Sequence, residues 1–291
     1  MKAVLVTGVG GNVGQYVAEN LYMSGYSVIG VYRKSKPRQT SYELIQADLS
    51  ESILELEGIE AVIHVAAGLY GNTECLVKDN VNSVLNLVKM AEKYNIKKFV
   101  YISTVSVYGK VNGELEVSSS ITDPEMYGIT KYIAENIVKE ADIPYRLIVG
   151  LPRMLGPFVD LNECRNSGFL TMAKKILRGE DVVCYIPDTV YNNYMHVSDL
   201  ADFLKVVLID PKVESCSKVL LGARDKLTMM EILMILKSAV GSNSKIAAKS
   251  SGTVPDCTLV SIADAVRMGY RPKPSAQILK AFMEEQKSKL F

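Results

Sequence analysis

Residues 7–14 read Thr-Gly-Val-Gly-Gly-Asn-Val-Gly, and this stretch decides the fold. An apolar run at residues 2–6 precedes it with the length of a buried parallel strand, and residues 15–23 follow with the spacing of a helix. Glycines at positions 8, 11 and 14 suit a tight turn, a close approach of the backbone to a pyrophosphate, and close packing of the helix on the strand. A helix that begins there also offers unpaired N–H groups to phosphate. The order of strand, glycine turn and helix therefore predicts a dinucleotide-binding site. Its expected contacts are Gly8, Gly11, Asn12, Val13 and Gly14.

The composition is that of an ordinary globular protein. The chain has 291 residues, of which 48% are hydrophobic and 22% are charged. A formal net charge of +1 provides no basic surface for nucleic acid or for an anionic membrane. The first apolar run ends in a glycine turn, unlike a signal peptide, and no run approaches the ~20 residues of a membrane-spanning helix. We therefore expect a cytoplasmic protein with no nucleic-acid or membrane partner.

The cysteines and histidines argue against a disulfide framework and against a metal site. Five cysteines are scattered through the chain without CxxC pairs, which is typical of free thiols in a reducing compartment. The histidines are His64 and His196, far apart in the sequence, so we expect no histidine-based metal site.

Strands alternate with helices through the first half of the chain. Apolar strand patterns follow at 27–32, 44–49, 61–65, 98–103 and 145–149, and amphipathic helix patterns at 73–94 and 124–139, the second with Asp123 as its cap. This alternation predicts a Rossmann-type α/β fold, in which residues 1–150 form a doubly wound parallel sheet that binds the dinucleotide.

The pattern changes after Pro152, where glycines and prolines interrupt it. We expect residues 151–291 to form mostly a smaller C-terminal substrate-binding lobe, with some segments that pack back on the first domain. Its expected helices lie near 170–177, 199–208, 229–240 and 275–287, and its short strands near 182–186 and 217–221. The last helix is expected to be exposed and amphipathic.

The end of the second strand predicts the choice of cofactor. An acid at this position normally bonds the ribose 2′-hydroxyl of NAD, but this chain has Tyr32-Arg33-Lys34. Arg33 and Lys34 would attract a 2′-phosphate, so the sequence favours NADP over NAD, with NAD still possible. The alternative interpretation is a solvated basic turn without a role in binding.

Tyr127 and Lys131 are the expected acid/base pair. Residues four apart share one helix face, and a nearby ammonium lowers the pKa of a phenol from its usual ~10. Tyr32 and Tyr94 also precede a lysine by four residues, but only Tyr127 starts a helix just after the fifth strand, whose end faces the ligand crevice. The same strand end carries Ser103 and Thr104, whose hydroxyls would either bond a substrate oxygen or satisfy the backbone of their own loop.

With these motifs in place, the chain resembles the extended short-chain dehydrogenase/reductases, and within them the nucleotide-sugar epimerase/dehydratase group. The matching segments are 7–14, 48–49, 64–67, 79–81, 103–109, 127–131, 156–157 and 196–201, followed by 268–272 near the C-terminus. The resemblance implies that Tyr127 is the catalytic acid/base, with Lys131 and Thr104 as its catalytic partners. It also implies cofactor contacts from Asp48, Leu49, Ala66, Ala67, Asn80, Ser103, Tyr127, Lys131 and Pro152. The implied substrate contacts are Thr104, Ser106, Arg153 and His196.

Departures from the family pattern narrow the expected activity. The family's dehydratases carry Asp-Glu after the threonine, where this chain has Val105-Ser106, which argues against a 4,6-dehydratase. The family often has an arginine in place of Leu151, and another in place of Asn192 that contacts the substrate diphosphate. The candidate substitutes are Arg153, Arg165 and Arg178.

The expected function is an NAD(P)-dependent oxidoreductase that acts on a sugar hydroxyl or ketone, in particular that of a nucleotide-sugar. The reaction would be a C4 epimerisation or the reduction of a 4-keto sugar. The alternative is a non-catalytic NADP-binding sensor of the same fold. The resemblance also implies a homodimer, formed by the helices at 73–94 and 124–139.

Overall fold

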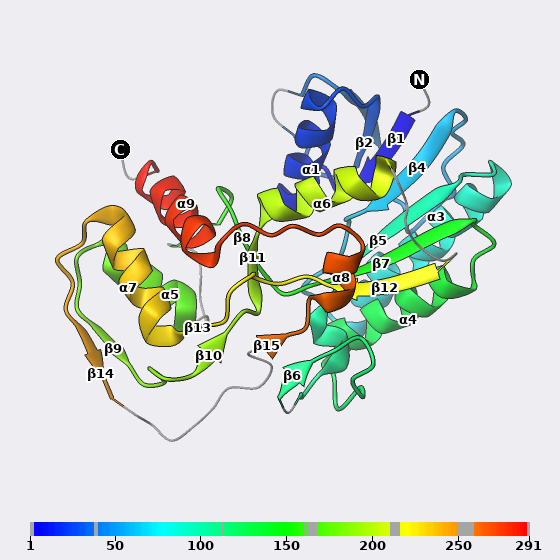
Figure 1. Ribbon diagram of the computed structural model, residues 1–291. Helices are drawn as coiled ribbons and strands as arrows, with labels where there is room; N and C mark the ends of the chain where they lie inside the picture. Colours follow the sequence, from blue (N-terminus) through cyan, green and yellow to red (C-terminus); the bar gives the residue numbers. More distant parts are fainter. Residues whose placement is uncertain are drawn as a thin grey trace.

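Seven parallel strands form one sheet within the part of the chain that the computed structural model describes (Figure 1). The described residues are 3–37, 40–111, 113–159, 161, 168–209, 216–249 and 259–289. The strands of the sheet are β1 (Ala3–Thr7), β2 (Val28–Tyr32), β3 (Glu43–Gln46), β4 (Ile59–His64), β5 (Lys98–Thr104), β7 (Tyr145–Leu151) and β12 (Cys216–Leu220). They lie in the order β12-β7-β5-β4-β1-β2-β3, and every neighbouring pair is parallel. From β1 the chain runs through β2 to β3 on one side and then continues with β4 on the other side of β1. The topological switch point of the sheet therefore lies beside β1. The predicted doubly wound α/β fold is confirmed.

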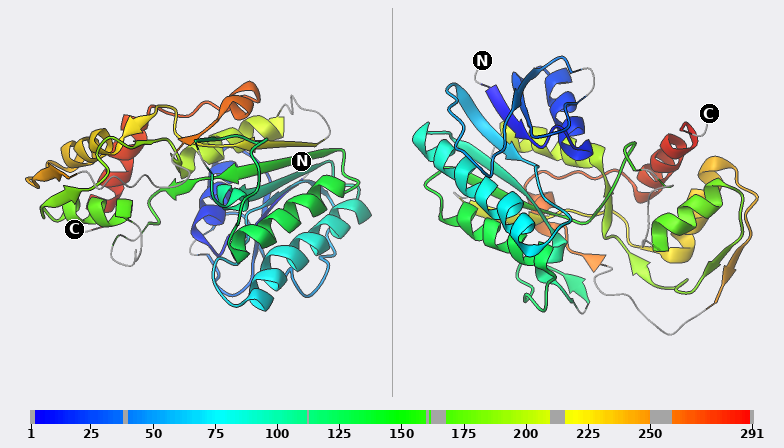
Figure 2. Two further views of the ribbon diagram at one scale, coloured as in Figure 1. Left: turned by 90° about the horizontal axis from the view of Figure 1, so that it is seen from below. Right: turned by 180° about the vertical axis from the view of Figure 1, so that it is seen from behind.

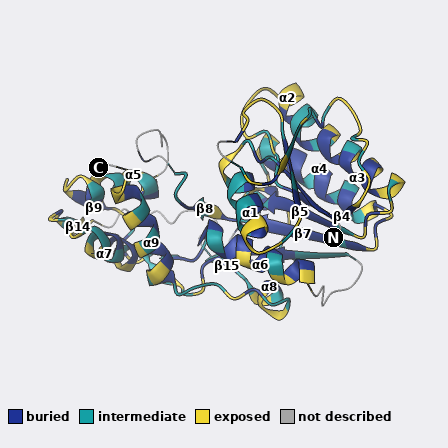
Figure 3. Cartoon of the chain, turned by 90° about the horizontal axis from the view of Figure 1, so that it is seen from above, coloured by how far each residue is buried: buried dark blue, intermediate teal, exposed yellow. Residues whose placement is uncertain are grey.

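Helices cover both faces of the sheet (Figure 2). One face carries α1 (Asn12–Met23), α6 (Val197–Ile209) and α8 (Ala263–Arg267). The other face carries α2 (Thr73–Val77), α3 (Ser83–Lys93) and α4 (Met126–Glu140). Because side chains alternate along a strand, Val4 and Val6 of β1 join the core under α1 and α6, whereas Leu5 joins the opposite core. The central strands β1, β4, β5 and β7 are therefore buried on both sides, whereas β3 at one edge of the sheet is partly exposed (Figure 3).

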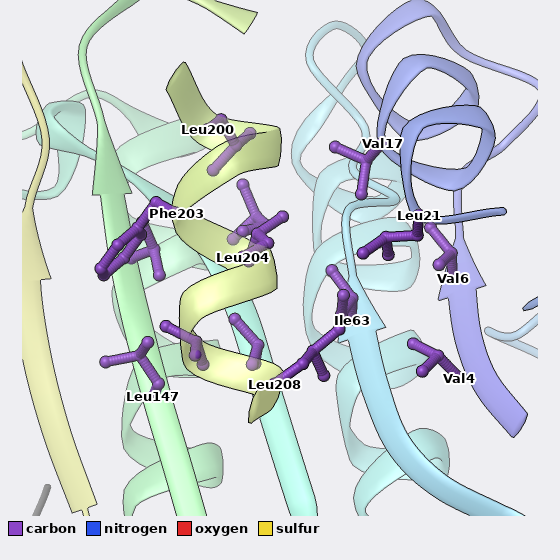
Figure 4. Packing of buried hydrophobic residues seen from close by; sticks show 14 of the residues in the cluster. Val4, Val6, Val17, Leu21, Ile63, Leu147, Leu200, Phe203, Leu204 and Leu208 are labelled. Carbon is purple, nitrogen blue, oxygen red and sulfur yellow. The ribbon is translucent and has the colours of Figure 1, made fainter. Parts of the chain in front are cut away.

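Helix α6 fixes part of the second half of the chain to the sheet. Its Leu200, Leu204 and Leu208 point toward the strands, and Ile63 of β4 lies in the same cluster (Figure 4). Each such side chain, fully buried, stabilises the fold by about 1.5–3 kcal/mol. Strand β12 extends the same sheet beside β7. The sequence analysis expected some segments of residues 151–291 to pack back on the first domain, and α6 and β12 are two segments that do so.

The second lobe is smaller and lies to one side of the sheet (Figures 1 and 2). Its helices are α5 (Gly168–Leu177), α7 (Met229–Val240) and α9 (Ser275–Lys287), and its paired strands are β9 (Val182–Cys184) with β14 (Ile246–Ala248) and β10 (Val190–Tyr191) with β13 (Leu227–Thr228). Helix α9 is amphipathic as predicted, but its apolar face is in the core of the lobe, where Phe282 and Met283 are fully buried. The substrate-binding role of this lobe stays a prediction.

Short segments join the two bodies. The parallel pair β8 (Arg153–Leu155) and β11 (Tyr194–His196) lies between them, and β15 (Leu259–Val260) pairs with β6 (Glu114–Leu115). None of the helices in the described ranges combines the length and the apolar composition needed to cross a membrane. Among the described cysteines, Cys75, Cys184 and Cys216 are free thiols, and Cys164 and Cys257 lie outside the described residues.

Two helix predictions need correction. The predicted helix at 73–94 is interrupted by a π-helical turn at Lys78–Asn82, which separates α2 from α3. Helix α4 begins at Met126 with Glu125 as its N-cap residue, later than predicted. Asp123 has a positive φ of 53° and pairs with Lys110 instead of capping the helix.

Candidate active site

A cavity of about 610 Å³ lies at the carboxyl ends of the strands around the switch point. Most of the residues predicted for the site line it. They are Gly8, Gly11, Asn12, Val13, Gly14, Tyr32, Arg33, Lys34, Asp48, Leu49, Ala66, Ala67, Ser103, Thr104, Tyr127, Lys131 and Pro152.

The glycine turn between β1 and α1 brings backbone close to backbone. Gly8 has a φ of +74°, and a Cβ atom on it would lie 2.7 Å from the backbone nitrogen of Ala66. A Cβ atom on Gly14 would lie 2.3 Å from the carbonyl oxygen of Gly8. Helix α1 starts after Gly11 without a side-chain cap and without an acid in its first turn. Its first N–H groups therefore remain available to an anion in the cavity, as a pyrophosphate requires.

Thr7 fixes the wall opposite the glycine turn. Its Oγ1 accepts hydrogen bonds from the backbone nitrogens of Val65, at 3.1 Å, and Ala66, at 3.2 Å. Its own hydroxyl then donates to Nδ1 of His64 at 2.7 Å, which assigns the proton of the neutral imidazole to Nε2. Burial lowers the pKa of His64 to about 3, so the ring stays neutral. In the sequence analysis His64 was only a member of the matching segment 64–67. In the structure it orients the Thr7 hydroxyl, which holds the backbone of Val65 and Ala66.

Tyr127 and Lys131 lie at the inner end of the cavity, near the start of α4. The Lys131 Nζ donates a hydrogen bond of 2.7 Å to the carbonyl oxygen of Ile102 and lies 4.2 Å from the ring centroid of Tyr101. Burial lowers the pKa of Lys131 to about 7, although the carboxylate of Glu135 opposes this shift.

The predicted lowering of the tyrosine pKa does not occur in this environment. Burial raises the pKa of Tyr127 to about 12. The prediction rested on the attraction between an ammonium and a phenolate, but in the protein both groups are buried away from water. Desolvation disfavours the charged form of each, and it is the larger effect here. Any stabilisation of the phenolate must therefore come from a group that binds in the cavity.

The hydroxyls beside Tyr127 divide into two kinds. Ser103 is buried and lines the cavity, but its hydroxyl is bound to Glu135 Oε1, to which it donates at 2.6 Å. Thr104 lines the cavity, and its Oγ1 accepts from the backbone nitrogen of Ser106 at 3.2 Å while donating to Ser106 Oγ at 3.2 Å. Thr104 thus caps the 3₁₀ turn Val105–Tyr108, which is the loop-satisfying role that the sequence analysis left open. Ser106 is exposed and lies outside the lining of the cavity.

Three further predicted residues also lie outside the cavity lining. Asn80 is buried and holds the loop after β4, because its amide pairs with both the N–H and the C=O of Gly68 at 2.8 and 2.9 Å. The guanidinium of Arg153 lies 5.6 Å from the ring centroid of Phe169. His196 is buried between Ser198, at 2.9 Å, and Glu285 of α9, at 3.2 Å. Asn80 and His196 are therefore supporting residues, and their predicted ligand contacts stay predictions.

Sequence reasoning missed several residues of the cavity. Gly10 is one, and a Cβ atom on it would lie 2.2 Å from the carbonyl oxygen of Ser35. Asp79 is another, and it forms an ion pair with Arg33 at the cavity mouth, with 2.5 Å between Nη1 and Oδ1. The sequence could have indicated Asp79, because it lies next to Asn80 in the matching segment 79–81. The remaining missed lining residues are Val31, Ser35, Ala47, Ser50, Val65, Leu69, Ser83, Ile102, Leu151 and Met154.

A protein-family model described as the NAD dependent epimerase/dehydratase family matches residues 4–220. The chain belongs to this family. The prediction of an enzyme of the extended short-chain dehydrogenase/reductase type is confirmed with it.

Curated relatives in the family cover most of the chain. The UDP-glucose 4-epimerase uge1 of Schizosaccharomyces pombe is 27% identical over 305 residues, and the match covers 88% of this chain and 85% of that protein. The Bacillus subtilis protein described as the uncharacterized UDP-glucose epimerase YtcB is 23% identical over 288 residues, which covers 87% of this chain and 89% of the relative.

Solved structures have the same fold along the whole chain. The UDP-glucose 4-epimerase of Thermotoga maritima, solved with UDP-glucose, has a TM-score of 0.79 at 22% identity and covers 99% of this chain and 100% of its own. The UDP-glucuronic acid 4-epimerase of Bacillus cereus, solved with UDP-glucuronic acid and NAD, has a TM-score of 0.77 at 20% identity, with the same coverage of 99% and 100%. At these identities the likeness establishes the fold.

This member of the family lacks the expected arginine at position 192, and the structure gives a reason for the amide there. Asn192 is buried and binds the backbone of Val260 in both directions, at 2.7 and 2.8 Å. It thereby fixes β15 and has no charge to offer a diphosphate. Of the candidate substitutes, Arg153 and Arg178 are exposed outside the cavity lining, and Arg165 lies outside the described residues.

Proposed function

We propose that this chain is an NAD(P)-dependent nucleotide-sugar 4-epimerase in which Tyr127 is the acid/base, assisted by Lys131 and Thr104. The observation that carries the proposal is that these three residues line the same cavity as an uncapped, glycine-bounded helix start. The family membership and the names of the relatives support the same reaction. The first turn of α1 would hold the pyrophosphate, and Asp48 and Leu49 would lie against the adenosine.

The chemistry of the site follows from its side chains. A bound nicotinamide supplies the reversible oxidation of the sugar carbon and, in its oxidised form, a positive charge. Tyr127 holds a proton at its phenol oxygen, since burial raises its pKa to about 12, and the phenolate needs that external charge. Tyr127 exchanges this proton with the sugar hydroxyl, Thr104 accepts or donates a hydrogen bond at the same oxygen, and Lys131 lines the same cavity with its Nζ held by the carbonyl oxygen of Ile102.

A turnover screen tests this function. The purified protein is incubated with UDP-glucose, UDP-galactose, UDP-glucuronic acid and UDP-N-acetylglucosamine, without added reductant, and the C4 epimers are separated by chromatography. Tyr127→Phe should slow epimerisation by about 10²–10⁴-fold while cofactor binding persists. Tyr22→Phe, on the exposed side of α1, is the matched control and should leave the rate unchanged. Wild-type turnover by the Tyr127→Phe variant would refute the assignment of Tyr127.

The same screen separates the other candidates. A 4-keto reductase would require added NADPH and would consume it in a stoichiometric amount, whereas an epimerase regenerates its cofactor. A non-catalytic sensor would bind the dinucleotide without turnover. The joint presence of Tyr127, Lys131 and Thr104 on one cavity argues against the sensor.

The choice between NAD(H) and NADP(H) is a finer part of the proposal. The sequence favours NADP(H) through Arg33 and Lys34, both of which line the cavity. Against this, Arg33 is paired with Asp79 and also lies 3.9 Å from Asp48, so a 2′-phosphate would meet two carboxylates there. We therefore expect at most a modest preference for NADP(H), which decreases as salt rises. Calorimetric titration of both cofactors at low salt measures it, and tighter binding of NAD(H) would overturn it.

A homodimer in the cytoplasm completes the proposal. A groove of about 580 Å³ runs between α3 and α4, the helices expected at the interface. Leu85 of α3 and Ile133 of α4 line this groove and are 38% and 42% exposed. An isologous pairing of these helices in two copies would bury both residues.

A further inference from the structure

Asp79 and Arg33 form a two-pronged ion pair across the mouth of the cavity. The Nη1 and Nη2 atoms of Arg33 donate to the two carboxylate oxygens of Asp79 at 2.5 and 3.0 Å. Arg33 follows β2, whereas Asp79 lies in the π-helical turn between α2 and α3, 46 residues later in the sequence. The parallel arrangement of two N–H···O bonds occupies the Nη1/Nη2 edge of the guanidinium, an edge that could otherwise bind a phosphate.

Gly68 holds the acid from the other side. A Cβ atom on Gly68 would lie 2.8 Å from the Cβ of Asp79 and 2.9 Å from its Oδ2. The Asp79 side chain is only 19% exposed, compared with 41% for Arg33. The carboxylate is therefore confined between the loop after β4 and the guanidinium, so that the acid is fixed and the arginine approaches it.

The ion pair lies at the end of β2, where this fold contacts the 2′ position of the adenosine ribose. The group at the end of β2 normally distinguishes NAD from NADP, by an acid for the 2′-hydroxyl or an arginine for the 2′-phosphate. Here Tyr32 offers no acid, and the carboxylate comes from a different element. We propose that Asp79 is a cofactor-specificity residue, which lowers the affinity for NADP(H) relative to NAD(H) because it competes with the 2′-phosphate for Arg33. The inference rests on the dinucleotide site of the proposed function and names the residue that sets its selectivity.

Asp48 is less suited to this role, although it also faces Arg33. Its Oδ1 accepts hydrogen bonds from the backbone nitrogen and the hydroxyl of Ser50, at 3.0 and 2.5 Å. Its Oδ2 lies 3.9 Å from the guanidinium, beyond hydrogen-bonding distance. Asp48 therefore contributes only a screened attraction to Arg33, and the direct competition comes from Asp79.

Calorimetric titration of NAD⁺ and NADP⁺ into cofactor-free protein tests the inference. Asp79→Asn keeps the shape of the side chain but removes its charge, and should raise the ratio of NADP⁺ to NAD⁺ affinity by about tenfold or more. Gly68→Ala, which displaces the Asp79 carboxylate without removing it, should change the ratio in the same direction. Asp123→Asn, in the exposed pair with Lys110, is the matched control because neither residue lines the cavity, and it should leave the ratio unchanged.

The Arg33→Ala background separates competition from simple repulsion. If Asp79 acts by holding Arg33, Asp79→Asn should leave the affinity ratio of the Arg33→Ala protein unchanged. An unchanged ratio in the single Asp79→Asn variant, with wild-type thermal unfolding, would overturn the inference. So would an equal rise of the ratio with and without Arg33. These are binding measurements, so a protein that shifts its ratio as expected but epimerises no sugar would refute the proposed reaction and leave the role of Asp79 intact.

Discussion

Replacement of Lys131 by methionine should make the protein more stable near neutral pH. Lys131 is 2% exposed, and burial lowers its pKa from 10.5 to about 7. Between these two values the unfolded chain binds a proton that the native protein does not, so stability rises as the pH rises. A difference of about 3.5 pKa units means that the buried lysine costs about 4 kcal/mol of folding free energy at pH 7 and less than about 1 kcal/mol at pH 10.

The methionine removes this cost but also removes a hydrogen bond. The Nζ of Lys131 donates to the Ile102 carbonyl oxygen at 2.7 Å, and loss of that partner costs about 1–3 kcal/mol. The expected net result for Lys131→Met is a gain of about 1–3 kcal/mol at pH 7, and no gain or a small loss at pH 10. Epimerase activity should be lost at both pH values, which is the usual conflict between stability and function at a buried charge.

Urea unfolding at pH 7, 8.5 and 10 measures this difference between variant and wild type. Lys280→Met, on an exposed position of α9, is the matched control and should show the same difference from wild type at each pH. The reasoning fails if the Lys131→Met difference stays constant from pH 7 to pH 10. It also fails if the variant gains stability relative to wild type as the pH rises, since that has the opposite sign.

Three further outcomes are expected. Glu135→Gln should destabilise the fold by about 3 kcal/mol, since it leaves the largely buried Lys218 side chain, 2.7 Å from Glu135, without its counter-charge, and adding Lys218→Met should restore most of the loss in urea unfolding. Sedimentation velocity should find a dimer for the wild type and a monomer for Ile133→Asp, and a wild-type monomer at about micromolar concentration would exclude the α3–α4 interface. Gly14→Ala should weaken dinucleotide binding at least about tenfold because its Cβ would lie 2.3 Å from a backbone oxygen, whereas Gly168→Ala, whose Cβ would have no described residue within 4 Å, should bind normally; equal affinities would contradict this account of the turn.

The central sheet was predictable because its signals are local. Except for β3, each strand from β1 to β7 in the sheet contains a short apolar run, and a glycine turn between a strand and a helix is typical of a dinucleotide site. The sequence did not indicate that β12 is one of the segments that pack back on the first domain, because only its last residues, Val219 and Leu220, are fully buried. A half-buried strand of five residues does not specify its partner strand, and only the register with β7 decides it. The π-helical turn was missed because apolar spacings of three and four continue through it.

The sequence predicted which residues lie together in the candidate site, but it did not predict where their side chains point or what surrounds them. Motif spacing placed Tyr127, Lys131 and Thr104 at one strand end, and the structure brings them together. Spacing could not predict burial, and burial decides the pKa of both Tyr127 and Lys131. The sequence could not predict the ion pair between Arg33 and Asp79 either, because this pair depends on how the end of β2 packs against the π-helical turn.

The path of the chain through β12 limits how this protein can be divided. After the sheet reaches β7, the chain visits the second lobe, returns as α6 and β12, leaves again through α7, and returns as β15 and α8. A fragment that ends near residue 150 would lack β12 and expose the hydrogen-bonding edge of β7 together with the apolar surface under α6. Such a fragment should aggregate instead of folding as an autonomous nucleotide-binding unit. The second lobe therefore cannot be exchanged as one contiguous segment, and under its proposed substrate-binding role a change of specificity would require substitutions within the whole chain.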